Sequence, residues 1–270
     1  TIAAPATSNI TSDTAFLGFS ITNMEYAPNY TLTNPTTGGQ LAFGIGSFTS
    51  ISETMELFGS GHMIQQGTFT VNQDADSNAA IVFTGTGSLQ LNRANVITRA
   101  IRMNGGSTLI AANSNAAMGT DSVFLTSSHL TLRNDSPLTW NNIVSATGRV
   151  RLGTDRSSPG AGVNLTLNRM NYTHASTDSL RCFSGPNVIS GEMGFTVNTL
   201  SMTNPNTTLV FDCRDFASLN PITMTFTAAF TKVGSGQLTL NAPGRNNTNA
   251  VTLLGGRLRL LQANSLNQNN

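Results

Sequence analysis

The chain has 270 residues, of which 39% are hydrophobic and only 10% are charged. Ordinary soluble domains carry about 25% charged residues, so uncharged hydroxyl and amide side chains must cover most of this surface. The 14 Lys and Arg and the 13 Asp and Glu give a formal net charge of +1 and are scattered without clusters. We therefore expect no nucleic-acid partner, no anionic membrane surface as partner and, for lack of a long apolar run, no membrane-spanning segment.

Short runs in which apolar and polar residues alternate recur along the chain. A period of two over a few residues indicates a β-strand. Turn clusters rich in Gly, Asn, Ser and Pro separate the runs, as at Asn204-Pro205-Asn206. One segment, Ala94 to Ala100, has a spacing compatible with a short helix, but the predicted fold class is all-β. The expected strands are Thr68 to Val71, Leu89 to Leu91, Leu130 to Leu132, Val163 to Leu167, Leu209 to Phe211, Met224 to Phe226, Leu238 to Leu240 and Leu258 to Leu260.

An internal repeat relates residues 85 to 117 with residues 234 to 266. The two copies align with two single-residue slips. Each copy has a Gly-X-Gly start, a short strand with alternating leucines, a polar bend, a Gly-Gly turn and an Ala-Asn-Ser link. One such unit cannot bury its leucine face alone, so neighbouring units must stack and share a core.

Two all-β architectures compete, a parallel β-helix and an antiparallel sandwich or barrel. Tight hairpins favour Asn-Gly or Asp-Gly turns of two residues, whereas the bends here are uneven in length and rich in Asn, Ser and Thr. This favours a β-solenoid with roughly twenty residues per coil. We expect one domain over residues 1–270, with residues 1–13 as an N-terminal arm, and inward side chains at Leu89, Leu91, Leu109, Leu238, Leu240, Leu258 and Leu260.

The segments 114 to 143 and 232 to 266 resemble the autotransporter-associated β-strand repeat of bacterial surface proteins. The resemblance rests on the Gly-X-Gly start, the Leu-Thr-Leu strand at Leu238 to Leu240, the Gly-Gly turn and the Trp-Asn-Asn-Ile end at Trp140 to Ile143. It covers residues 83 to 150 and 232 to 270. The resemblance implies a right-handed parallel β-helix exported to the cell surface, and it indicates architecture far better than activity. Nothing here resembles the membrane β-barrel that ends an autotransporter.

Carbohydrate-active β-helices place two or three acids, with a basic residue, on stacked turns. The candidates are His62, Asp74 with Asp76, and Asp212 with Arg214 and Asp215. None of them completes a catalytic set, and solvated turn residues explain such neighbours more simply. We therefore expect no catalytic residues and no enzyme activity.

The remaining polar and aromatic candidates favour structural roles. Asp74 to Asn78 has oxygen ligands spaced as at the start of a calcium loop but lacks the turn glycine and the closing Glu, so a surface turn is favoured. His62, His129 and His174 lack metal-ligand spacing, and we expect no metal and no cofactor. For Trp140, an inward stack is favoured over an exposed sugar platform.

The two cysteines, Cys182 and Cys213, leave two interpretations open. They form either one disulfide between stacked coils or two buried thiols, because sequence separation does not determine the Cα distance.

Two functions follow, from different classes. The first is a non-catalytic structural or adhesive element at the bacterial cell surface, because the chain begins at Thr1 without Met, as an exported mature protein does, and its polar surface is neutral. Its partners would be cell-surface glycans or copies of itself, stacked head-to-tail because repeat character runs uncapped through Leu258 to Leu261. The alternative is a β-helix polysaccharide lyase or glycoside hydrolase.

Overall fold

The computed structural model describes residues 7–11, 29–34, 40–43, 54–59, 62–65, 70–71, 81–173, 179–203, 208–225, 229–241 and 250–261, with side chains from residue 81 onward. Every regular element in these ranges is a β-strand. The chain divides into two compact units, Thr1–His129 and Leu130–Asn270, which are described separately. The expectation of a single domain stays a prediction.

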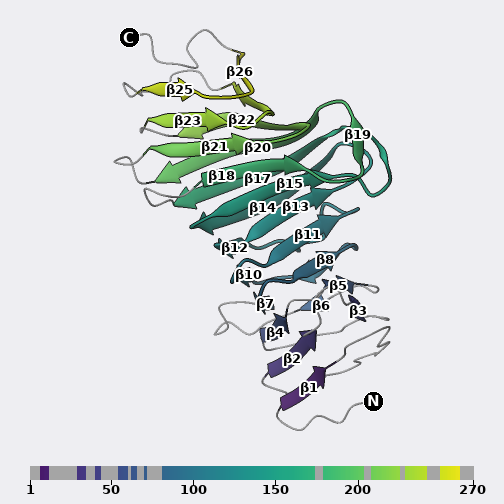
Figure 1. The fold of residues 1–270 in the computed structure, drawn as a ribbon. Coiled ribbons are helices and arrows are strands. Elements are labelled where there is room, and N and C mark those ends of the chain that lie inside the picture. Colours follow the sequence, from purple (N-terminus) through teal and green to yellow (C-terminus); the bar gives the residue numbers. More distant parts are fainter. Residues whose placement is uncertain are drawn as a thin grey trace. The chain divides into compact units, whose positions relative to one another are not determined.

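The first unit contains two parallel sheets (Figure 1). The first sheet has the order β1 (Thr7–Thr11), β2 (Asn29–Asn34), β4 (Thr54–Gly59), β7 (Ile81–Thr84), β10 (Ile101–Asn104) and β12 (Val123–Thr126). The second has β3 (Gln40–Phe43), β5 (His62–Gln65), β8 (Ser88–Leu91) and β11 (Thr108–Ala112). The short strands β6 (Thr70–Val71) and β9 (Val96–Ile97) pair with each other.

The second unit repeats this arrangement. Its first sheet has the order β14 (Leu138–Thr147), β17 (Asn164–Thr173), β20 (Met193–Thr203), β22 (Ala217–Thr225), β24 (Gln237–Leu240) and β26 (Arg257–Leu260). Its second sheet has β13 (His129–Arg133), β15 (Val150–Asp155), β18 (Ser179–Ser184), β21 (Leu209–Cys213), β23 (Phe230–Val233) and β25 (Val251–Leu253). The short strands β16 (Gly160–Ala161) and β19 (Val188–Ser190) form a small parallel pair at one corner.

The chain coils from one sheet to the other and back. In the second unit each coil contributes one strand to each sheet, because β17, β20, β22, β24 and β26 alternate in sequence with β18, β21, β23 and β25. Successive coils pair in parallel and in register. Gln237 lies beside Arg257, and the coil between these two residues therefore takes twenty residues. The coil from Asn164 to Gly194 takes thirty, because it includes the additional strand β19. The expected all-β fold, a parallel β-helix, is confirmed.

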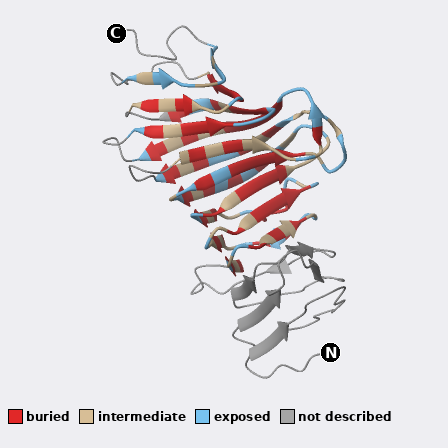
Figure 2. Ribbon diagram, in the orientation of Figure 1, coloured by how far each residue is buried: buried red, intermediate tan, exposed pale blue. Residues whose placement is uncertain are grey.

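Inward side chains form columns that run from coil to coil. In the first unit, Ile81, Ile101 and Val123 align on adjacent strands and are no more than 1% exposed. In the second unit, Phe195 and Leu219 are fully buried in the same way. Figure 2 shows the resulting alternation of buried and more exposed residues along the strands. Because apolar residues occupy every second position, the sequence periodicity places one face of each strand in the core.

Most of the leucines expected to point inward do so. Leu89, Leu91, Leu109, Leu238 and Leu240 are fully buried. The expectation is wrong for Leu260, which is 45% exposed, and is only partly met for Leu258, which is half-buried. Both residues lie in β26, which has one neighbour among the described strands, so the column continues in register but no described coil covers it.

The other strand predictions also agree with the structure, with one correction. Over the described residues, the predicted strands coincide with parts of β6, β8, β13, β17, β21, β22, β24 and β26. Thr68, Phe69 and Phe226 of the predicted strands lie outside the described residues. The short helix considered for Ala94 to Ala100 is wrong: this segment contains β9, which pairs with β6. Tertiary pairing therefore overrides its weak helical spacing, because an isolated helix of this length is marginal in water.

Candidate functional site

Asp212 is the buried centre of an ion-pair cluster. It lies at the end of β21 beside Arg181 of β18, whose Nε donates to Asp212 Oδ2 at 2.9 Å. Arg214 Nε donates to both carboxylate oxygens, at 3.0 and 2.9 Å. Burial alone raises the pKa of the Asp212 carboxyl, but the hydrogen bond and charge of Arg214 and the charge of Arg181 outweigh it and lower the pKa. This carboxylate is therefore held ionised and bonded, which suits a structural role better than proton transfer.

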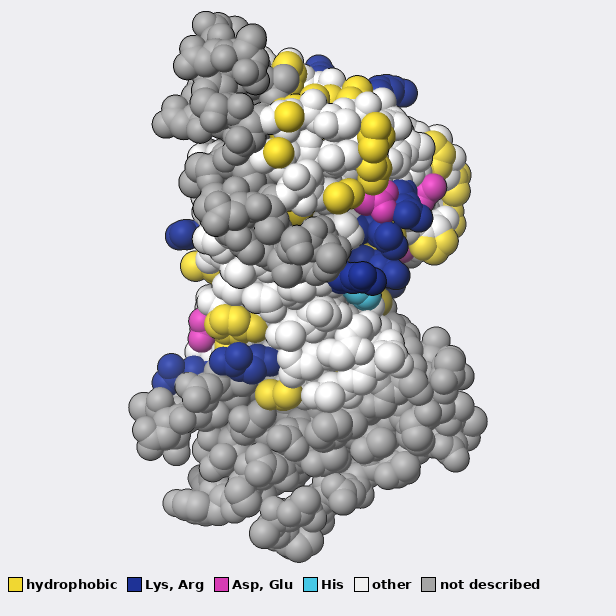
Figure 3. Space-filling view, turned by 60° about the vertical axis from the view of Figure 1, so that its left-hand side comes forward, with side chains coloured by type: hydrophobic (Ala, Val, Ile, Leu, Met, Phe, Trp, Pro, Cys, Tyr) yellow, Lys and Arg dark blue, Asp and Glu magenta, His cyan; other side chains and the backbone are white. Residues whose placement is uncertain are grey.

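The cluster also corrects the expectation that charges are scattered. Arg151 of β15 lies in register beside Arg181, so two guanidinium groups occupy adjacent strands on the outer face of the second sheet. Asp212 partly compensates them, because it follows Arg181 in the same row. In Figure 3, basic side chains gather next to acidic ones on one face of the molecule. Like charges directly opposite each other on neighbouring strands are unfavourable, and sequence distance alone did not reveal this row.

Most of the other sequence candidates have side chains outside the part of the chain whose side chains the structure describes. Asp74, Asp76 and the proposed turn to Asn78 lie outside the described residues, as does His174. His62 begins β5, and His129 is half-buried at the start of β13. Over residues 81–261, as far as they are described, no three His, Cys, Asp or Glu side chains gather where they would hold a metal ion. Within the same ranges no helix has the length and apolarity needed to cross a membrane.

Trp140 and the cysteines belong to the core. Trp140 is fully buried on β14, as the inward-stack interpretation predicted. Cys182 of β18 and Cys213 of β21 lie in register on adjacent strands, and both are fully buried, free thiols. Burial raises the pKa of both thiols, that of Cys213 to about 12, so neither is a reactive thiolate near neutral pH.

Lys232, the only lysine of the sequence, is fully buried on β23. Its Nζ donates to the carbonyl oxygens of Val233, Gly234 and Gly255, the last at 3.2 Å across to the next coil. Burial lowers the pKa of this ammonium group, although the nearby Cys213 and Asp212 oppose the shift. An ammonium group has three donors, and here each one meets a carbonyl, so Lys232 ties two corners together.

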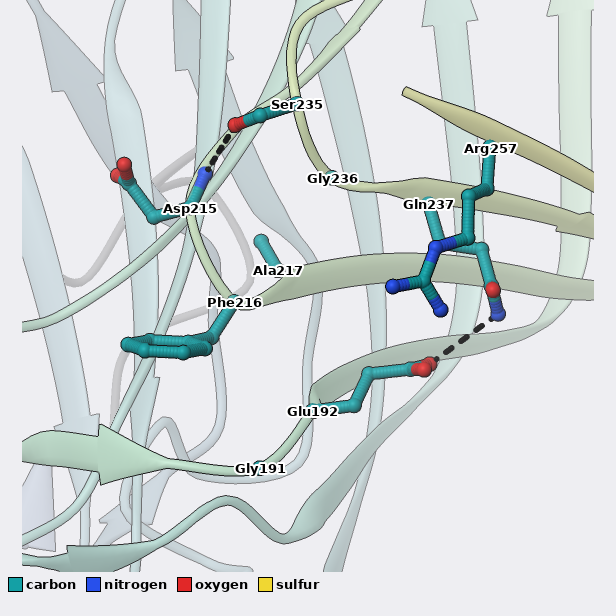
Figure 4. A pocket seen from close by; sticks show the side chains of 9 residues that line it. All are labelled: Gly191, Glu192, Asp215, Phe216, Ala217, Ser235, Gly236, Gln237 and Arg257. Carbon is teal, nitrogen blue, oxygen red and sulfur yellow. Dashed lines mark hydrogen bonds between the residues drawn. The ribbon is translucent and has the colours of Figure 1, made fainter.

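A pocket of about 310 Å³ opens at one corner of the second unit. It is built from the point where four successive coils enter the first sheet: before β20, before β22, before β24 and at the start of β26. These corners are joined by backbone hydrogen bonds, such as Met193 N to Phe216 O at 2.9 Å and Arg257 N to Gly236 O at 3.2 Å. The lining residues, drawn in Figure 4, are Gly191, Glu192, Asp215, Phe216, Ala217, Ser235, Gly236, Gln237 and Arg257.

Backbone geometry keeps these corners close together. A Cβ atom on Gly236 would lie 2.4 Å from the carbonyl oxygen of Ala217, so only glycine fits at this approach of two coils. Asp215 adopts a left-handed conformation with φ of 55°, which is uncommon outside glycine. Its backbone N–H donates to Ser235 Oγ at 3.1 Å. The turn leaves Phe216 46% exposed at the edge of the pocket.

Three polar side chains of the pocket lie on the other side from Phe216. Figure 4 shows Glu192, Gln237 and Arg257 pointing toward one another, with Ala217 between this group and Phe216. Gln237 is 8% exposed, and its Nε2 donates to Glu192 Oε1 at 3.3 Å and to Thr239 Oγ1 at 2.9 Å. Arg257 is exposed and forms no ion pair with any described residue. The carboxylates of Asp215 and Glu192 point in different directions, so they do not converge on one bond as glycosidase acids do.

Sequence reasoning found Asp215 but missed the rest of the pocket. Its residues span Gly191 to Arg257 and come together only through coil stacking. One local signal was available: Phe216 follows two charged residues in a turn, where a large aromatic side chain has no strand face to occupy.

The described C-terminal coil exposes the column that earlier coils bury. Leu240 is fully buried, whereas Leu260, beside it in register, is 45% exposed. Leu253, Leu254 and Leu261 are 50%, 72% and 48% exposed. The edges of β25 and β26 therefore present backbone groups that have no pairing strand among the described residues. Exposed leucine side chains lie beside these groups.

Comparison with known proteins identifies no relative: no protein-family model, no curated protein and no solved structure matches the chain.

Proposed function

We propose that this protein is a non-catalytic structural and adhesive β-helix of the bacterial cell exterior, and that copies associate head-to-tail through the edge formed by β25 and β26. The observation that carries the proposal is the exposed leucine column at this edge. The same column is fully buried one coil earlier, so a further coil has an apolar surface to cover. Parallel strands pair only when their edge is free, and a contact that does not close on itself produces a filament.

The chemistry of the side chains supports a role without turnover. Asp212, the more buried of the two described acidic candidates, is occupied by Arg181 and Arg214. Outward positions on the first sheet carry neutral hydroxyl groups, such as the aligned Thr173 and Thr203, whose Oγ1 atoms are 2.9 Å apart. Such a surface displays hydrogen-bonding groups with little charge repulsion between copies.

Self-association is tested with a double variant at the edge. Leu258→Lys with Leu260→Pro adds a charge and removes a backbone donor from β26. Ile222→Lys is the matched control, because it adds the same charge at a 43% exposed position on β22, away from the edge. Light scattering over a concentration series, with negative-stain microscopy, should show assemblies for the parent and the control and monomers for the double variant. A monomeric parent at high concentration, or a double variant that assembles like the parent, refutes self-association.

The carbohydrate-active alternative rests on the two carboxylates of the pocket, Glu192 and Asp215. A screen for release of reducing ends or unsaturated products from polysaccharides distinguishes it. Turnover that is lost in Glu192→Gln or Asp215→Asn would replace the proposed function with catalysis.

A further inference from the structure

Phe216 is displayed at the surface by a tight turn. The residue before it, Asp215, has a φ of 55°, a left-handed conformation that aspartate adopts more readily than most other residues. Here a hydrogen bond from Ala217 N to Arg214 O closes the turn at 3.0 Å. An exposed aromatic ring beside a pocket is a common platform for the apolar face of a ligand.

The opposite side of the pocket offers both hydrogen-bond acceptors and donors. Glu192 presents a carboxylate that accepts one hydrogen bond among the described residues, from Gln237, and so retains further acceptor sites. Arg257 supplies a guanidinium group that forms no ion pair among the described residues. Hydroxyl groups both donate and accept, so adjacent hydroxyls of one ligand satisfy a carboxylate and a guanidinium together.

We infer that this pocket binds a neutral pyranose unit of a glycan, with the ring against Phe216 and its hydroxyl groups bonded to Glu192 and Arg257. The volume of about 310 Å³ lies at the small end of ligand pockets and suits a ligand of one sugar ring. Glu192 and Arg257 carry opposite charges on the same side of the pocket, so the group proposed to meet the hydroxyls has no net charge and suits a neutral sugar. The inference rests on the proposed adhesive role but not on self-association.

The arginine row on the second sheet provides the contrasting surface. Arg151 and Arg181 lie in register and would attract acidic polymers, whereas neither residue lines the pocket. Binding of neutral and of acidic glycans therefore reports on two different places in the same unit.

Affinity gel electrophoresis tests the inference with named polymers. Hydroxyethylcellulose, xylan and galactomannan serve as neutral probes, and polygalacturonate serves as the acidic probe. The variants are Phe216→Ala and Glu192→Gln at the pocket, Arg151→Ser in the arginine row and Ile222→Ala as matched control. Ile222 is 43% exposed, close to the 46% of Phe216, and does not line the pocket. Circular dichroism checks that each variant is folded.

At least one neutral polymer should retard the parent. Phe216→Ala should weaken this binding about tenfold and Glu192→Gln severalfold, while Ile222→Ala and Arg151→Ser remain within about twofold of the parent. No retardation by any neutral polymer, or equal binding by Phe216→Ala and Ile222→Ala, overturns the inference. Retardation by polygalacturonate alone that is lost in Arg151→Ser also overturns it. Light scattering on Phe216→Ala separates the two proposals, because loss of glycan binding should leave self-association unchanged.

Discussion

The inward leucine column contains both a buried and an exposed leucine, so the losses of unfolding free energy on truncating each of them can be predicted and compared. Leu240 is fully buried on β24, and Leu260 lies beside it in register on β26 with 45% exposure. Leu240→Ala removes the transfer free energy of the side chain and leaves a cavity, which typically costs about 2 to 5 kcal/mol. Leu260→Ala removes a half-exposed side chain with little cavity, so its cost should be about 1 kcal/mol.

Urea denaturation of the parent and both variants, under dilute conditions that keep the protein monomeric, measures the difference. The denaturant dependence of the unfolding free energy should stay constant, so that the midpoints report stability. A Leu240→Ala variant within about 0.5 kcal/mol of the parent would contradict the inward packing of this column. Equal losses at the two positions would contradict the assignment of β26 as an edge that no described coil covers.

Three further predictions concern the buried charged and ionisable groups. Lys232→Met should lower the unfolding free energy by about 1 to 3 kcal/mol in chemical denaturation, because its carbonyl partners lose their donor; equal or greater stability would argue against this role. Asp212→Asn should destabilise the fold by about 1 to 3 kcal/mol at neutral pH. It should also make the unfolding free energy fall less steeply with decreasing pH. The reason is that the lowered pKa of Asp212 contributes stability that is full above its ordinary value of 3.8 and is lost as the pH falls through the lower folded value. Burial raises the pKa of Cys213 to about 12. The contribution of this thiol to the unfolding free energy is therefore full below the ordinary value of 9.0 and falls by about 1.4 kcal/mol per pH unit above it. Cys213→Ala should reduce the loss of unfolding free energy that is measured between pH 9 and 10.5.

The internal repeat shows which features follow from local sequence and which depend on the tertiary structure. Both copies form the predicted strand, β8 in the first and β24 in the second, with their leucines fully buried. The glycine corners also recur, since Gly105 lies over Gly85 and Gly255 over Gly234. Yet β8 belongs to the second sheet of its unit and β24 to the first sheet. A period of two selects one buried face, and both sheets of a β-helix require the same pattern, so the repeat cannot specify which sheet its strand joins.

Stacking also decided which side chains meet across coils. The sequence by itself determined the strand type, the positions of the corners and the burial of residues such as Leu89 and Trp140, because these depend on alternation and glycine turns within a few residues. The position of Cys182 beside Cys213 and the grouping of Glu192 with Arg257 required the register of coils that differ in length from 20 to 31 residues. Corners of different lengths can hold the same register, whereas a one-residue slip of the register would turn a strand face from the core to the solvent, so only the tertiary structure defines these neighbours.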